Sequence, residues 1–382
     1  MSQKYILQDI FLKQQTRDNH AGLIYIEKNP LWAMNKKDYI LPNYLLILDE
    51  LKYVKKGSDN IRAYGTGNII KEIHRDLKEV RTSKEVYKET HPRQTYFNWI
   101  NGVSGIAIQD LYNLCLYWKR AGNKTEKEFN RLWHKIYLSA NYFGCTNGKQ
   151  IKLPKQMDNK LAYLLGVIMG DGHLAYPDKS YDKRTTYNSE VRITDGHKET
   201  FINLTTVFQE LFGYTPKIYS EKSKINKKFY RFVIKSKPLH RFLMNICEIP
   251  TGNKSNKTSI PKIIKSSSLE IQKSFITGFF DADGYIGLKK GKYPHIAICQ
   301  KNKEILLSII KISKNYNLEW KGPHKILSRG DKISYSINLS NIKDIKSFLK
   351  HFPPYNPIKL WQSEVIWERI NQMEKNQSCT LH

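Results

Sequence analysis

Cysteine is scarce in this 382-residue chain, and the few cysteines are scattered. No two of them stand in the Cys-x-x-Cys spacing that zinc sites and redox motifs use. An odd number of isolated thiols also argues against a disulfide framework. The five cysteines are Cys115, Cys145, Cys247, Cys299 and Cys379.

Long hydrophobic runs are missing as well. The amino terminus, MSQKYILQDIFLKQQ, has no apolar core of the kind that a secretory signal needs. Nowhere do about 18 apolar residues follow one another, which is the minimum for a membrane-spanning helix. We therefore expect a soluble intracellular protein of the cytoplasm, the nucleoid or an organelle, with no membrane partner.

Acidic residues are few relative to basic ones. The chain has 63 Lys and Arg against 35 Asp and Glu, a formal net charge of +28. Such a positive field determines partners rather than fold. On charge alone, nucleic acid is the leading class of partner and an anionic membrane surface is the second.

Two linker-like stretches divide the chain. Residues 138–160 are rich in Asn, Gly and Lys, and residues 249–268 contain two Pro among several Lys. They predict an accessory domain at 1–150, a first repeat at 155–265 and a second repeat at 266–382.

The repeats are visible as an internal duplication. LAYLLGVIMGDGHL (161–174) and SFITGFFDADGYIG (274–287) align so that Asp171 falls on Asp283 and Gly172 on Gly284. After each motif the residue pattern predicts two strands, a helix, two strands and a helix. We expect an α+β fold of two pseudo-twofold-related αββαββα repeats, preceded by a mainly helical domain.

Small residues recur four apart in both motifs. They are Gly166 and Gly170 in the first motif, and Gly278 and Ala282 in the second. Residues at this interval let two helices approach closely, which brings Asp171 and Asp283 together near the pseudo-twofold axis. Two neighbouring carboxylates repel one another, and a divalent cation relieves that repulsion. As a lone motif, Asp-Gly would more simply be the end of a helix.

LLGVIMGDG (164–172) and ITGFFDADG (276–284) resemble the LAGLIDADG motif of homing endonucleases, in the two-motif, monomeric form, over roughly 160–375. The resemblance implies a site-specific endonuclease that cuts both strands of DNA by Mg²⁺- or Mn²⁺-dependent hydrolysis and serves intron homing. The expected metal site comprises Asp171, Asp283, Gly170 and Ala282. The sixth motif position departs from the family name in the first copy, where it is Met169, whereas the second copy keeps an aspartate there, Asp281.

The resemblance also implies a lysine near each metal site. Lys254 and Lys257 follow the last strand–helix unit of the first repeat, and Lys359 follows that of the second. Such a lysine can polarise the attacking water or stabilise charge on the phosphate. In so basic a chain, each of them could equally be a plain phosphate contact.

The predicted strands alternate apolar and polar residues, which is typical of sheets with one buried face. We expect the polar faces to bind a long, asymmetric duplex DNA site, with some side chains reading bases and others contacting phosphate. A merely solvated face is the alternative. The candidate DNA-binding residues are Arg192, Lys217, Tyr219, Arg231, Lys235, Lys289, Gln300, Lys325 and Asn338.

In the accessory domain, RQTYFNWINGVSGIAIQDLYNLC (93–115) resembles a helix-turn-helix with Asn101–Gly102 at the turn. A helical packing domain without DNA contact is the alternative. Two other functions remain open for the whole chain. One is an RNA-binding maturase acting on intron RNA, and the other is a transcription regulator that binds DNA without cutting it.

Overall fold

The computed structural model describes residues 39–41, 43–48, 60–89, 91–145, 148–176, 189–223, 226–254, 258–328 and 332–379. These residues belong to one compact unit, Asp38–His382. Lys257, one of the predicted site residues, lies outside the described residues. Within the described part, no helix combines the length and the apolar character that crossing a bilayer requires.

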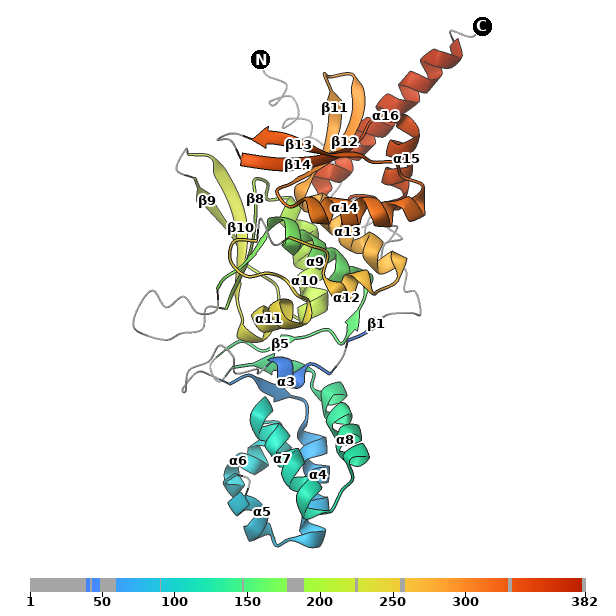
Figure 1. The fold of residues 1–382 in the computed structure, drawn as a ribbon. Coiled ribbons are helices and arrows are strands. Elements are labelled where there is room, and N and C mark those ends of the chain that lie inside the picture. Colours follow the sequence, from blue (N-terminus) through green and yellow to red (C-terminus); the bar gives the residue numbers. More distant parts are fainter. Residues whose placement is uncertain are drawn as a thin grey trace. The chain divides into compact units, whose positions relative to one another are not determined.

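The amino-terminal part of this unit combines helices with short strands (Figure 1). Its sheet has the strand order β3-β2-β4-β5, and a separate pair joins β1 to β6. The helices are α3 (Leu45–Leu48), α4 (Gly67–Val80), α5 (Ser83–Glu89), α6 (Arg93–Ile100), α7 (Ile108–Ala121) and α8 (Glu126–Ser139). The strands are β1 (Tyr39–Ile40), β2 (Arg62–Tyr64), β3 (Ile106–Ala107), β4 (Tyr142–Gly144), β5 (Ile151–Lys152) and β6 (Gln156–Met157).

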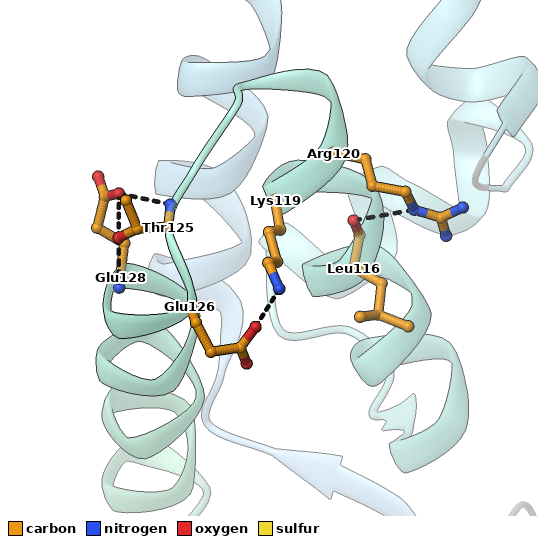
Figure 2. Close-up of polar contacts among 6 residues, drawn as sticks. All are labelled: Leu116, Lys119, Arg120, Thr125, Glu126 and Glu128. Atoms are coloured by element: carbon orange, nitrogen blue, oxygen red, sulfur yellow. Dashed lines mark hydrogen bonds and ion pairs between the residues drawn. The ribbon is translucent and has the colours of Figure 1, made fainter.

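The connection between α7 and α8 shows how local sequence sets a helix start (Figure 2). The Thr125 side chain accepts the Glu128 backbone N–H, and the Glu128 carboxylate accepts the Thr125 backbone N–H, which completes a capping box. Lys119 of α7 forms an ion pair with Glu126 in the first turn of α8. These contacts fix the angle at which the chain enters α8.

The first repeat has the predicted order of elements. It consists of α9 (Asn159–Asp171), β7 (Gly172–Leu174), β8 (Glu190–Asp195), α10 (Thr200–Phe212), β9 (Ile218–Lys222), β10 (Lys228–Lys235) and α11 (Lys237–Arg241), which continues as a π-helical turn at Phe242–Ile246. The four strands form an antiparallel sheet in the order β7-β8-β10-β9. A short helix, α12 (Lys262–Lys265), lies in the connection to the second repeat.

The second repeat repeats this order. It consists of α13 (Leu269–Asp283), β11 (Gly284–Lys289), β12 (Tyr293–Gln300), α14 (Lys303–Ser313) with a 3₁₀ turn at Lys314–Tyr316, β13 (Lys321–Ser328), β14 (Lys332–Leu339) and α15 (Ile342–His351). Its antiparallel sheet has the order β11-β12-β14-β13, and α16 (Pro357–Cys379) follows. The prediction of two αββαββα repeats is confirmed.

One face of each sheet is buried, as the alternation predicts. Val191, Ile193, Phe232 and Ile234 are buried in the first sheet, whereas Arg192 and Arg231, which alternate with them, are partly exposed. In the second sheet the buried face carries Ile286, Ile296, Ile298, Ile337 and Leu339. Burial of these apolar side chains against the helices is the main force that holds each repeat together.

Candidate active site

Helices α9 and α13 lie side by side along their length, and glycine makes that approach possible (Figure 1). A Cβ atom at Gly278 would lie less than 3.0 Å from the Tyr163 carbonyl oxygen of the facing helix. Reciprocally, a Cβ atom at Gly166 would lie 2.6 Å from the backbone nitrogen of Phe279. Since real Cβ atoms essentially never come that close, only glycine permits this separation.

The same packing brings the two motif aspartates together. Asp171 is the last residue of α9 and Asp283 is the last residue of α13. Near this end a Cβ atom at Gly170 would clash with Ala282 and would lie 2.9 Å from Oδ2 of Asp283. The carboxylate of one helix therefore reaches across the backbone of the other.

A glycine follows each aspartate for a reason that concerns space rather than a left-handed helix cap. Gly172 and Gly284 both have φ of −78°, which is open to any residue. A Cβ atom at Gly172 would lie 2.5 Å from the Ile168 carbonyl oxygen, and at Gly284 it would lie 2.5 Å from the Phe280 carbonyl oxygen. The chain turns directly from helix into strand over the last helical turn, and a side chain would block it.

Both aspartates are hard to ionise in this position. The pKa of Asp171 is raised to about 7, mainly by burial and also by the nearby Asp283 and Asp195 carboxylates, while Lys359 and Lys254 act in the opposite direction. The pKa of Asp283 is also raised by burial, against the lowering effect of the same two lysines and of Gln300. Two buried carboxyl groups that repel each other favour a shared cation.

Each helix that ends in an aspartate also has a lysine at its last carbonyl groups. Lys254 Nζ donates to the Ile168 carbonyl oxygen of α9 at 2.6 Å. Lys359 Nζ, from α16, donates to the carbonyl oxygens of Phe280 at 2.6 Å and Asp281 at 2.9 Å, both on α13. The ammonium groups thus add a further donor at carbonyl groups of the last helical turn, at the negative end of each helix.

The two lysines are held in surroundings that disfavour their charge. Burial lowers the pKa of Lys254 to about 8, although Asp283 and Asp171 act to raise it. The pKa of Lys359 is lowered by burial against the attraction of Asp281 and Asp171. The structure brings both predicted lysines to the aspartates, one from each repeat.

Gln300 occupies a place that the sequence does not reveal. We expected it to contact DNA bases, but its Nε2 donates to Oδ2 of Asp283 at 2.5 Å. It sits at the end of β12, in the strand that pairs with β11 directly after Asp283. A cavity of about 260 Å³ opens here, lined by Lys254, Thr258, Asp283, Gln300 and Ser334 among others.

The predicted DNA-binding residues that lie in strands of the first repeat share one face of its sheet. Arg231 of β10 pairs with Tyr219 of β9 on one side and with Thr194 of β8 on the other. Two residues further along β10, Val233 pairs with Arg192 of β8. Lys217, Tyr219 and Lys235 are exposed. The two arginines have carboxylate partners on the same sheet: Arg231 forms an ion pair with Glu221, and Arg192 lies 3.7 Å from Glu190.

The predicted residues of the second repeat are divided between two faces. Asn338 of β14 pairs with Ala297 of β12. Tyr335, three residues before Asn338 on β14, pairs with Gln300 of β12 and with Lys325 of β13. Because side chains alternate along a strand, Lys325 and Gln300 point to the other side from Asn338. Lys289 is exposed at the end of β11. The outward face of this sheet also carries Ser334 and Ser336 of β14.

An ion at this site would find only oxygen donors. They are the carboxylates of Asp171 and Asp283 and the backbone carbonyl groups of Gly170 and Ala282, and the last of these lies 3.3 Å from Lys359 Nζ. In the described part of the chain, no third His, Cys, Asp or Glu joins the two aspartates in a metal-binding group. A small set of hard oxygen ligands suits Mg²⁺, which keeps several waters and binds substrate phosphate.

Comparisons with known proteins agree with this architecture. Residues 270–353 match the family model of the LAGLIDADG-like domain. A probable translation initiation factor IF-2 of Methanocaldococcus jannaschii is 26% identical over 234 residues, which span 58% of this chain but only 18% of that relative. The chain thus matches less than a fifth of that relative's length.

Two solved structures are similar in part. One concerns mesophilic variants of the homing endonuclease I-DmoI, with a TM-score of 0.38 and 24% identity, covering 52% of this chain and 97% of that one. The other is the N-terminal LAGLIDADG domain of DUF199/WhiA, with a TM-score of 0.34 and 18% identity, covering 51% of this chain and 81% of that one. The family-model match falls within the second of the two repeats in this chain.

Proposed function

We propose that this chain is a site-specific DNA endonuclease that hydrolyses phosphodiester bonds on both strands of a long duplex site. The observation that carries the proposal is the symmetric pair of half-buried aspartates at the ends of two close-packed helices, each with a lysine at the end of its helix. One chain supplies both halves, so a monomer suffices. Because the halves differ in sequence, the target is asymmetric.

The residues of the chain have distinct tasks in this reaction. Asp171 and Asp283 hold the divalent ion, with Gly170 and Ala282 beside them. When bound, such an ion stabilises charge on the attacking and leaving oxygens. Lys254 and Lys359 place positive charge next to the phosphate, where negative charge develops. Gln300 fixes the orientation of the Asp283 carboxylate through its hydrogen bond.

The sheets supply the binding surface. Their outward faces carry Tyr219, Lys235 and Lys289 exposed to solvent, and the exposed Lys217 directly precedes β9. When DNA binds, Arg192 and Arg231 exchange their carboxylate partners for a phosphate or a base. The exchange costs desolvation free energy. It also discriminates against DNA sites that offer these arginines no acceptor.

The test is a cleavage selection from a randomised duplex library with Mg²⁺, comparing the natural chain with Asp283→Asn. We expect one long cut sequence that disappears with the variant. Asp158→Asn is the matched control: Asp158 caps the opposite end of α9 by accepting the Leu161 N–H, and Asn caps equally well. This control should cut normally.

The selection also separates the proposal from its rivals. Binding to duplex DNA without a cut by the natural chain would point to a regulator. Binding to structured RNA with no duplex preference would point to a maturase. Either outcome would refute the endonuclease.

A further inference from the structure

Helix α5 ends at Glu89 and α6 begins at Arg93, so the two helices follow one another closely in the chain. A turn of three to four residues between two helices is the length that a helix-turn-helix uses. By contrast, α6 and α7 are separated by residues 101–107, which include β3, a strand paired with β2. The lengths of these connections therefore favour a helix-turn-helix one helix upstream of the 93–115 segment that the sequence indicates.

Helix α6 is held on its neighbours by aromatic contacts. The rings of Tyr87 on α5 and Tyr96 on α6 meet edge to face, with centroids 5.8 Å apart. His74 of α4 lies against both, at 5.7 Å from Tyr87 and 4.9 Å from Tyr96. Trp99 is buried beside them. Because these rings are packed, the outer face of α6 is presented rigidly.

Backbone contact adds to this support. A Cβ atom at Gly67, the first residue of α4, would lie 2.6 Å from the Ile100 carbonyl oxygen at the end of α6. The carboxyl end of α6 is therefore clamped against α4, and the exposed residues lie toward its amino end.

The outer face of α6 carries side chains that can read bases. Arg93 and Gln94 are exposed, and Asn98 is partly exposed. Gln94 Nε2 donates to Asn98 Oδ1 at 3.2 Å, which aligns two amides one helical turn apart. The Arg93 guanidinium lies 5.6 Å from the Phe97 ring centroid. Asn and Gln suit adenine in the major groove, and Arg suits guanine.

The charge around α6 favours a polyanion. From Pro92 to Gln109 the sequence contains no Asp or Glu. The next carboxylate, Asp110, lies 3.5 Å from the His91 imidazole, which offsets its charge when that histidine is protonated. A phosphate backbone therefore meets no acidic residue along this helix or the turn after it.

We propose that α5 and α6 form a helix-turn-helix whose second helix, α6, enters the major groove of duplex DNA and reads bases beyond those covered by the two sheets. This binding does not depend on cleavage. It extends the recognised sequence at one end, with the amides of Gln94 and Asn98 specifying adenine-containing steps.

The experiment is a binding selection from a randomised duplex library, without Mg²⁺, using the full chain and the variant Gln94→Ala/Asn98→Ala. We expect the natural chain to enrich a sequence with a separate terminal block, and the variant to lose that block alone. On the selected duplex the variant should bind about 10-fold more weakly or worse, since a good bidentate contact contributes about 1–3 kcal/mol.

A matched control lies on the next helix. Gln109 Nε2 donates to Asn113 Oδ1 at 3.3 Å, the same exposed amide pair on α7. Gln109→Ala/Asn113→Ala should keep the terminal block. Loss of the block in both variants, retention in both, or no enriched terminal block with the natural chain would each overturn the proposal.

A second substitution covers the case in which the double variant loses binding only because it misfolds. Arg93→Glu alters one exposed side chain and sets a carboxylate against phosphate, so binding should fall while the thermal melting temperature stays unchanged. Normal binding by Arg93→Glu would refute the docking of α6. Because binding is selected here, a chain that reads DNA through α6 but cuts nothing would defeat the endonuclease proposal and leave this one standing.

Discussion

The hydroxyl of Tyr163 on α9 donates a hydrogen bond to Oδ2 of Asp281 on α13 at 2.8 Å, inside the buried seam between the helices. The same oxygen accepts the backbone N–H groups of Tyr355 and Asn356, each at 2.8 Å. Asp281 therefore ties both central helices to the segment that leads into Lys359. Burial raises the pKa of this carboxyl group to about 6, although these donors act to lower it.

Removing the acceptor should be far costlier than removing one donor. Asp281→Met copies the residue at the equivalent position of the first repeat, Met169, and leaves three buried donors without a partner. We expect a loss of about 3 kcal/mol or more in unfolding free energy, at about 1–3 kcal/mol for each orphaned group. Tyr163→Phe removes one donor and should cost less. Denaturant unfolding measures both, and an Asp281→Met chain as stable as the natural one would contradict this role.

The close approach of α9 and α13 predicts a sharp glycine requirement. Gly278→Ala places a Cβ atom against the Tyr163 carbonyl oxygen, so the helices must separate and the buried seam must loosen. We expect destabilisation of about 3 kcal/mol or complete failure to fold, within the range of overpacked cores. Gly196→Ala is the control, since a Cβ atom there meets nothing within 4 Å. Equal melting temperatures for the two variants would argue against the packing described.

The ammonium of Lys359 should matter for cleavage more than for binding. Lys359→Met keeps most of the side-chain stem but removes the charge beside the α13 carboxyl end and the phosphate. Cleavage of the selected duplex should fall about 100-fold or more, as for loss of a preorganised charge stabiliser. Affinity for uncut duplex should change little. Lys311→Met, at an exposed position of α14, is the matched control, and a Lys359→Met chain that cuts at the natural rate would refute the assignment.

His240 predicts an acid-sensitive step in stability. Burial lowers its pKa to about 4, and the carbonyl oxygen of Ala175 accepts the hydrogen bond of its Nε2 at 2.8 Å. The unfolded chain binds a proton near pH 6.5, whereas the folded chain does so only near pH 4. Stability is therefore full above pH 6.5 and falls as pH drops from 6.5 to 4, by up to about 1.4 kcal/mol per pH unit.

The measurement is unfolding free energy against pH for the natural chain and His240→Gln. The variant has no group that titrates at this position, so its curve should be flatter across that window. Arg241 and His173 also lower the pKa of His240. The contribution of His240 is therefore read from the difference between the two stability curves and not from either curve alone. Parallel curves would contradict the prediction.

The sequence by itself determined the duplication, the order of elements in each repeat and the pairing of Asp171 with Asp283. These follow from local periodicity and from small residues at a fixed interval, which are properties of the chain before it folds. It also indicated Lys254 and Lys359 through family resemblance. Only the tertiary structure decided what Gln300 does, because its hydrogen bond to Asp283 depends on strand pairing between β11 and β12.

The same limit explains the remaining differences. Whether Lys325 shares a face with Asn338 depends on the register of β13 and β14, which shifts between Lys321 and His324, and a shift of one residue reverses a side chain's direction. The helix-turn-helix that we propose lies upstream of the predicted one because β3, only two residues long, pairs with β2 across more than forty residues of sequence and separates α6 from α7. Asp281 likewise gains its partners from segments far along the chain, and no local pattern encodes contacts that form only when distant segments pack together.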